Sequence, residues 1–268
     1  VIAPNEFPDF LAWLPASEKV LIYEKEKEKT AQIILEADLV FTLDFNALHR
    51  TGEMEQLLKK VTAPFIMIDH HQKPDDYAKY MFSDTKYGST CEMLYHFIVS
   101  LGNKDLIDKT IATCIYTGIV TDSGSFRFPS TTSTTHRVVA ELIDIGIENG
   151  AIHNNLFDNS SYNRLQLLGQ ALQNMRIKFD KQTSYITLTQ KELDQIVNYG
   201  LSIKGVVFAA IFIEHRDENI IKISFRSQGD FDVNQFAREH FSGGGHINAA
   251  GGKSYLSLKD TVAKFEDI

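Results

Sequence analysis

The chain has 268 residues, 43% of them hydrophobic, and a formal net charge of −8. That length suits two compact domains with cores of their own, and the acidic balance argues against a protein that coats long nucleic acid by charge. No apolar run approaches the roughly 18 residues of a membrane span, no signal peptide is visible, and the two cysteines lack CxxC spacing, so we expect a cytoplasmic protein.

Short apolar runs alternate with amphipathic stretches in the first half of the chain. Strands are predicted over residues 19–24, 39–46 and 65–71, and helices over residues 25–38, 53–61, 89–102, 105–122 and 132–146. Strands that are apolar on both faces and alternate with helices are typical of a parallel sheet covered on both sides. The opening "VIAP" reads as the end of a buried strand, so we expect residues before Val1 in the natural protein.

The character of the sequence changes near residue 155. One long helical pattern over residues 159–175 is followed by predicted strands over 176–180, 184–189, 206–214 and 220–227. A short helix over 233–241 and a glycine loop over 242–252 come next. These elements predict a smaller α/β domain, linked by a helix to the parallel-sheet domain.

Acidic and imidazole side chains stand where three apolar elements end. Asp44 ends the strand "VFTLD", Asp69, His70 and His71 end "FIMIDHH", and Asp122 ends an apolar helix. Ligands of parallel sheets bind beyond the carboxyl ends of the strands, so these side chains can share one crevice. A lone Asp there is usually a turn former, but two histidines directly after an Asp favour a functional site.

We therefore expect Asp44, His70 and Asp122 to be metal ligands. Two carboxylates and an imidazole suit Mn²⁺ better than Zn²⁺, which favours thiolates. Asp69 is placed to hold a neighbouring imidazole in one tautomer. Since consecutive side chains diverge, His70 can bind metal while His71 faces the substrate.

A second candidate site lies in the last fifty residues. Gly243, Gly244 and Gly245 precede His246, and their backbone N–H groups are expected to form an anion nest. Arg226 lies at the end of a predicted strand, where its guanidinium can donate two hydrogen bonds to one phosphate. A glycine run alone usually indicates a flexible loop, but glycines with a His and an Arg favour a phosphate-bearing substrate.

These segments together resemble the DHH phosphoesterases, over essentially the whole chain. The similarity rests on "TLDFN", "IDHHQ" and "TGIVTDSGSF", and on "FRS" and "GGGHINAAGG", which resemble the family's DHH-associated C-terminal domain. The bacterial subgroup that cleaves nanoRNA and 3′-phosphoadenosine 5′-phosphate is the most similar. The resemblance implies a catalytic domain over residues 1–157, a helical linker over 158–180 and a substrate-binding domain over 181–268.

The resemblance also implies an activity, its cofactors and residue roles. The expected enzyme hydrolyses short 5′-phosphorylated oligoribonucleotides, 3′-phosphoadenosine 5′-phosphate or both, with water activated by two Mn²⁺ ions, Mg²⁺ being the alternative. Asp44 would bridge the ions, His70 and Asp122 would be metal ligands, and His71 would contact the scissile phosphate. The far end of the substrate would be bound by Arg226, Ser227, Gly243, Gly244, Gly245 and His246.

The sequence departs from the family pattern at two places. The family's first motif, a His and two Asp after the first strand, is absent, and we expect it upstream of "VIAP". A chain that begins at Val1 would bind metal poorly and be inactive. The loop between Leu193 and Asn198 is shorter than in the family, which suggests residues missing there.

Other functions stay open at this point. Hydrolysis of cyclic or linear dinucleotides fits the same motifs, and a nucleotide-binding protein without activity would retain the fold. The expected partners are short RNA or a nucleotide bisphosphate, with no long duplex and no membrane, and a homodimer is an option.

Overall fold

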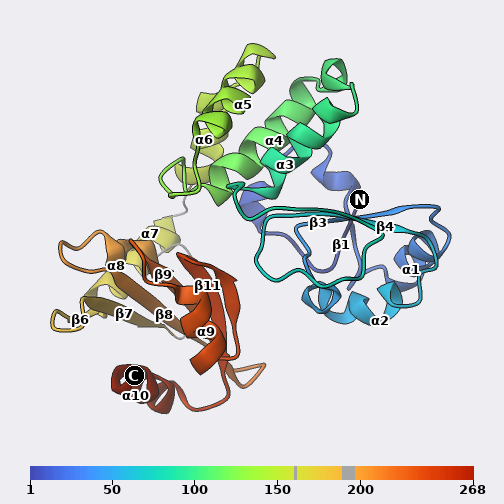
Figure 1. Cartoon of the computed structure of the whole chain (residues 1–268). Coiled ribbons are helices and arrows are strands. Elements are labelled where there is room, and N and C mark those ends of the chain that lie inside the picture. Colours follow the sequence, from blue (N-terminus) through green and yellow to red (C-terminus); the bar gives the residue numbers. More distant parts are fainter. Residues whose placement is uncertain (160–161, 189–196) are drawn as a thin grey trace. The chain divides into compact units, whose positions relative to one another are not determined.

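The computed structural model describes residues 1–159, 162–188 and 197–268. The chain divides into two units, Val1–Asn159 and Ser160–Ile268 (Figure 1). No helix in these described ranges is long and apolar enough to cross a membrane.

A small parallel sheet lies at the centre of the first unit. Strands β3 (Val40–Leu43), β4 (Phe65–Asp69) and β5 (Tyr80–Ser83) run parallel in the order β3-β4-β5. Two shorter strands, β1 (Ile2–Ala3) and β2 (Leu21–Ile22), form a separate parallel pair. Strand β5 was not predicted, because only four residues of it are extended and all are at least partly exposed.

The helices of this unit pack on the sheet and on one another. They are α1 (Lys27–Leu35), α2 (Glu55–Leu58), α3 (Thr90–Ser100), α4 (Lys109–Asp122), α5 (Ser133–Asp144) and α6 (Asn149–Phe157), with 3₁₀ turns η1 (Asp9–Leu11), η2 (Ser17–Lys19), η3 (Leu48–Met54) and η4 (Lys104–Leu106). The expected helix over 53–61 begins at the end of η3, which Gly52 kinks at φ 61° and ψ −130°, and its α-helical part is the short α2, which ends at Leu58. Helix α6 was not predicted.

Helices pack against both faces of the sheet, as the apolar strands predicted, although Phe41 and Leu43 of β3 stay partly exposed. On one face, Ile34 of α1 and Leu58 of α2 pack in a cluster with Phe65 of β4. On the other face, the Phe41 ring of β3 meets the Phe97 ring of α3 edge to face, with centroids 6.0 Å apart. The predicted parallel α/β architecture is therefore confirmed.

A second core holds the helices of this unit together. Side chains from α3, α4, α5 and α6 bury one another around Ala112, Val120 and Leu142, none of which is exposed. The hydroxyl of Ser89 accepts a hydrogen bond from the Glu92 N–H at 3.0 Å and caps the start of α3. The packing of these helices fixes the positions of Thr90, the first residue of α3, and Asp122, the last residue of α4.

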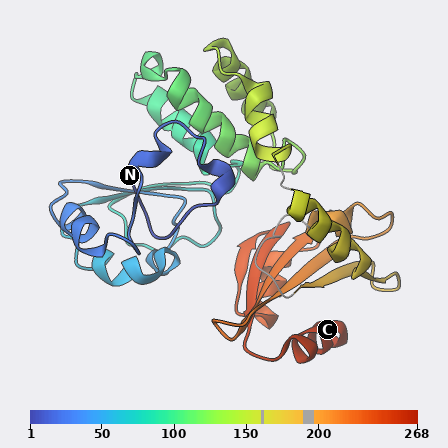
Figure 2. The same ribbon diagram turned by 180° about the vertical axis from the view of Figure 1, so that it is seen from behind.

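The second unit is a six-stranded sheet in the order β10-β11-β9-β8-β7-β6. Its elements are α7 (Tyr162–Gln173), β6 (Arg176–Lys178), β7 (Thr183–Leu188), α8 (Val197–Leu201), β8 (Phe208–His215), β9 (Ile220–Ser227), α9 (Val233–His240), β10 (Gly244–His246), β11 (Ala249–Ser254) and α10 (Leu258–Asp267). Among the described strands of this sheet, β7 and β8 are the only pair that runs parallel. Figure 2 shows the same fold from behind.

Strand β8 shows how this sheet is buried on both faces. Phe208, Ala210 and Phe212 pack with residues of α9 and α10. The alternate residues Ala209 and Ile211 pack with residues of α7 and α8. The segment expected as a linker, residues 158–180, thus contains α7 and β6, and both belong to the second unit.

The prediction of a glycine loop over residues 242–252 is wrong. This segment forms β10 and β11, which pair antiparallel with Gly244 opposite Gly251. A Cβ on Gly243 would stand 1.9 Å from the Gly251 carbonyl oxygen, and one on Gly252 would stand 2.9 Å from the Phe241 Cβ. The glycines therefore permit close backbone packing within a sheet. The expected shortened loop between Leu193 and Asn198 falls largely on residues 189–196, outside the described part.

Candidate active site

Two strand ends bring the first pair of carboxylates together. Leu43 of β3 pairs with Ile68 of β4, so Asp44 and Asp69 follow at the same edge of the sheet. Asp44 has a φ of 67°, which is uncommon outside glycine and often marks a functional position. Its carboxylate accepts a hydrogen bond of 2.6 Å from the hydroxyl of Thr90, the first residue of α3.

The imidazole of His70 is buried and points one nitrogen at two acids. Its Nδ1 lies 3.1 Å from the Tyr87 carbonyl oxygen, which can only accept, so Nδ1 carries the proton. The Nε2 lone pair then lies 3.6 Å from Oδ1 of Asp44 and 3.6 Å from Oδ2 of Asp122. Burial lowers the pKa of His70, which favours the neutral form of this ring.

Asp122 is the last residue of α4, and its carboxylate lies beside the same nitrogen of His70. Partial burial, followed by repulsion from Asp44, raises the pKa of Asp122 to about 7. Ligand atoms of Asp44, His70 and Asp122 all lie within 4.8 Å of one another. Three electron-pair donors in so small a space repel one another without a cation. Oxygen and nitrogen donors of this kind fit a divalent metal ion.

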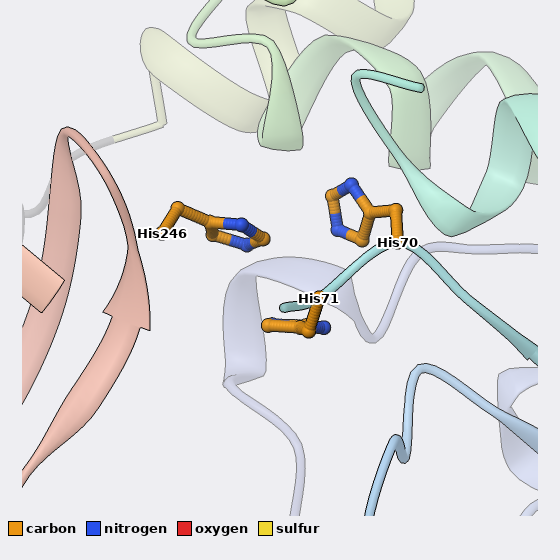
Figure 3. A group of neighbouring side chains, drawn as sticks. All are labelled: His70, His71 and His246. Carbon is orange, nitrogen blue, oxygen red and sulfur yellow. The ribbon is translucent and has the colours of Figure 1, made fainter. Parts of the chain in front are cut away.

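His71 has different neighbours from His70, although the two are adjacent. The two rings are inclined at 76° to each other, with centroids 5.0 Å apart. Figure 3 shows them turned in different directions. The Asp69 Oδ1 accepts from the His71 backbone N–H at 2.5 Å and lies 3.2 Å from the His71 Nδ1. Burial would raise the pKa of Asp69, but these hydrogen bonds outweigh it and lower the pKa. Asp69 therefore accepts as a carboxylate.

A second combination of donors is also compact. Ligand atoms of Asp44, Asp69 and His71 lie within 4.8 Å of one another. In this combination, however, Asp69 and His71 are already hydrogen-bonded to each other. The combination with His70 leaves a lone pair facing two carboxylates, so it is the better candidate for the metal.

In the second unit, three adjacent strands place the remaining expected residues. Arg226 near the end of β9 and His246 at the end of β10 both pair with Ala249, the first residue of β11. One Nη1 hydrogen of Arg226 is donated to the Phe225 carbonyl oxygen at 2.9 Å. Ser227 donates its hydroxyl to the Phe231 carbonyl oxygen at 2.6 Å. Figure 3 also labels His246, which belongs to this unit.

The glycines of this unit do not offer the expected free nest. The Gly243 N–H donates to the Ala237 carbonyl oxygen at 3.1 Å, and the Gly245 N–H donates to Oδ1 of Asn234 at 2.9 Å. Gly244 pairs with Gly251 across the sheet. Two of the three N–H groups are thus already bonded within the unit.

Three residues of the first candidate site were missed by sequence reasoning: Asn46, Arg50 and Thr90. Asn46 and Thr90 are buried polar residues, and Arg50 contacts His71. The run "DFNALHR" carries Asn46 and Arg50, but without the fold nothing turns them toward His71.

Comparison with known proteins identifies two domains. Residues 3–119 match the DHH family N-terminal domain, and residues 181–268 match the DHHA1 domain. A crystal structure of an exopolyphosphatase-related protein from Bacteroides fragilis superposes with a TM-score of 0.93 at 38% identity, covering all of this chain and 81% of that one.

Curated relatives carry names that describe an activity. The bifunctional oligoribonuclease and PAP phosphatase NrnA of Bacillus subtilis is 32% identical over 72% of this chain. The protein of the same name from Thermus thermophilus is 32% identical over 69% of it. The aligned parts cover 63% and 57% of those relatives, so the chain spans less than two thirds of their length.

Proposed function

This chain belongs to the DHH family, and we propose that it is a metal-dependent phosphoesterase that hydrolyses short 5′-phosphorylated oligoribonucleotides, 3′-phosphoadenosine 5′-phosphate or both. The observation that carries the proposal is the buried imidazole of His70, whose Nε2 faces the carboxylates of Asp44 and Asp122 at 3.6 Å. The names of the similar NrnA proteins support the substrate class.

We propose Mn²⁺ as the ion, held by Asp44, His70 and Asp122. Two carboxylates and an imidazole are the donors that Mn²⁺ accepts readily, and no thiolate is among them. Bound there, such an ion lowers the pKa of a water molecule and neutralises charge on a phosphoryl group. Tyr87 holds the ligand tautomer of His70 through its carbonyl oxygen, and Thr90 holds the carboxylate of Asp44.

The second unit is proposed to bind a part of the substrate remote from the bond that breaks. Arg226, Ser227 and His246 lie at neighbouring strand ends, and a guanidinium and an imidazole both recognise phosphate. Binding energy gained at a remote group can be used to position the reacting bond. Short substrates with a terminal phosphate would therefore be preferred.

Asp122→Ala tests this function. Loss of a metal ligand should lower Mn²⁺-dependent hydrolysis of a 5′-phosphorylated diribonucleotide by more than about 100-fold, the upper range for residues that merely support ligands. Asp144→Ala is the matched control, because Asp144 ends α5 as Asp122 ends α4. Initial rates with the dinucleotide, 3′-phosphoadenosine 5′-phosphate and a cyclic dinucleotide would identify the substrate.

Two results would contradict the proposal. One is a parent protein that carries the first motif expected upstream of Val1 and still hydrolyses none of these phosphoesters with Mn²⁺ or Mg²⁺. The other is an Asp122→Ala variant that turns over substrate as the parent does, which would exclude Asp122 as a ligand.

A further inference from the structure

Arg50 is an exposed side chain of η3 that reaches the candidate active site. Its Nη2 lies 3.2 Å from the Nε2 of His71, and its Nη1 donates to Oδ1 of Asn46 at 3.1 Å. Asn46 is buried, and its own amide donates to the Gln72 carbonyl oxygen at 2.8 Å. The guanidinium is therefore attached to the loop that carries the two histidines.

The direction of the Arg50–His71 hydrogen bond follows from the other side of the ring. His71 donates from Nδ1 to the Asp69 carboxylate, 3.2 Å away, because a carboxylate only accepts. In the neutral ring, Nε2 then has a lone pair, and it accepts from Arg50. In this arrangement His71 presents no N–H at Nε2 to a phosphate, so the group beside it that can donate is Arg50.

Arg50 has donors and charge left over. A guanidinium offers five N–H hydrogens, and its two bonds to neutral acceptors use two of them. In the parts of the chain that the structure describes, no carboxylate lies within 4.0 Å of Arg50, whereas Arg216 pairs with Glu214 at 3.0 Å. A cation held by neutral acceptors keeps its full charge for an anion.

We propose that Arg50 binds the phosphate group of the substrate, with Asn46 and His71 orienting its guanidinium. The proposal rests on the proposed function, because the phosphate is that of the proposed substrate. It assigns to Arg50 the phosphate contact that the family resemblance implies for His71, and makes His71 a positioning residue.

The test compares Arg50→Gln and Arg50→Lys in the full chain loaded with Mn²⁺. Calorimetry measures the Kd of inorganic phosphate, and initial rates measure kcat/KM for a 5′-phosphorylated diribonucleotide. Hydrogen bonds to charged groups correspond to roughly 10- to 100-fold in affinity. Arg50→Gln should therefore weaken phosphate binding and kcat/KM by about that factor with unchanged Mn²⁺ content, and Arg50→Lys should lie between it and the parent.

Arg137→Gln is the matched control. Arg137 is an exposed arginine of the same unit, and its hydrogen bonds are to the hydroxyls of Ser133 and Thr134 on its own helix. The Arg137→Gln variant should bind phosphate with the same Kd as the parent.

An Arg50→Gln variant that binds inorganic phosphate like the parent would overturn the proposal, even if its turnover fell, since the residue would then only position His71. A parent that binds no phosphate would overturn it as well. A parent that binds phosphate through Arg50 but hydrolyses no phosphoester would instead refute the proposed function alone.

Discussion

Adjacent residues of one strand end have separate partners in this protein. Tyr87 fixes the proton of His70 on Nδ1 through its carbonyl oxygen, and Asp69 fixes that of His71 on Nδ1 through its carboxylate. The remaining nitrogen of His70 faces Asp44 and Asp122, while that of His71 faces Arg50. One pair of identical side chains can therefore serve two functions.

This division predicts different defects for His70→Ala and His71→Ala. His70→Ala removes a nitrogen donor and should weaken Mn²⁺ binding by more than about 10-fold. His71→Ala removes the acceptor that orients Arg50, so it should leave Mn²⁺ affinity nearly unchanged and lower kcat/KM by about 10- to 100-fold. Titration of Mn²⁺ into both metal-free variants measures the difference. His136→Ala is the control, because it removes an exposed imidazole outside the candidate site.

An equal loss of Mn²⁺ affinity in the two variants would contradict the assignment. It would favour the other compact combination of donors, in which Asp44, Asp69 and His71 hold the ion.

The close approach of α3 and α4 determines where Asp122 lies. A Cβ on Gly118 of α4 would stand 2.1 Å from Sγ and 2.8 Å from Cβ of Cys91 in α3. Only glycine allows this approach. Because Thr90 precedes Cys91 and Asp122 follows Gly118 by about one helical turn, the contact places the support of Asp44 beside the ligand from α4.

Gly118→Ala should therefore push the two helices apart. Overpacking of this kind costs about 1–3 kcal/mol in unfolding free energy, and displacement of Asp122 should also weaken Mn²⁺ binding. Gly150→Ala in α6 is the matched control, because nothing lies within 4 Å of its added Cβ; it should stabilise the chain by up to about 1 kcal/mol. Urea denaturation measures both variants, and a Gly118→Ala chain as stable as the parent would mean that the contact is adaptable.

Hydrophobic periodicity predicted most elements of the parallel sheet domain and of the second sheet. It missed β5, whose four residues are at least partly exposed, and α6, whose apolar residues form only a weak amphipathic pattern. The glycine-rich strands β10 and β11 were missed for a different reason. Glycine has low intrinsic preference for strands, and there it is required by packing against Phe241 and between the two strands, which depends on tertiary structure.

The candidate metal ligands were predictable because each ends a strongly apolar element. Strand and helix ends converge in a parallel fold, and the structure brings Asp44, His70 and Asp122 within 4.8 Å of one another. Arg50 was not predictable in this way. It follows no periodic element, and its position depends on the Asn46 side chain and on the kinked 3₁₀ segment η3.

The chain folds into two units, and each unit has its own hydrophobic core. The first unit carries the candidate metal ligands, and the second carries Arg226, Ser227 and His246 at neighbouring strand ends. Under the proposed function, the first unit breaks the bond and the second contributes affinity for the substrate. The effect on kcat/KM of removing a binding residue from the second unit should then depend on which substrate is offered.

Arg226→Ala tests this dependence. Truncation of a charged contact typically costs about 2–5 kcal/mol when its partner loses its only counter-charge, so kcat/KM for a 5′-phosphorylated diribonucleotide should fall by at least about 30-fold. A minimal substrate such as bis(4-nitrophenyl) phosphate has no terminal phosphate for Arg226 to bind, and its hydrolysis should change much less. Arg216→Ala is the control, because Arg216 lies beyond the opposite end of the β8–β9 pair and contacts Glu214. Equal losses on both substrates would mean that Arg226, which also bonds the Phe225 carbonyl oxygen, supports the fold of the second unit instead of the substrate.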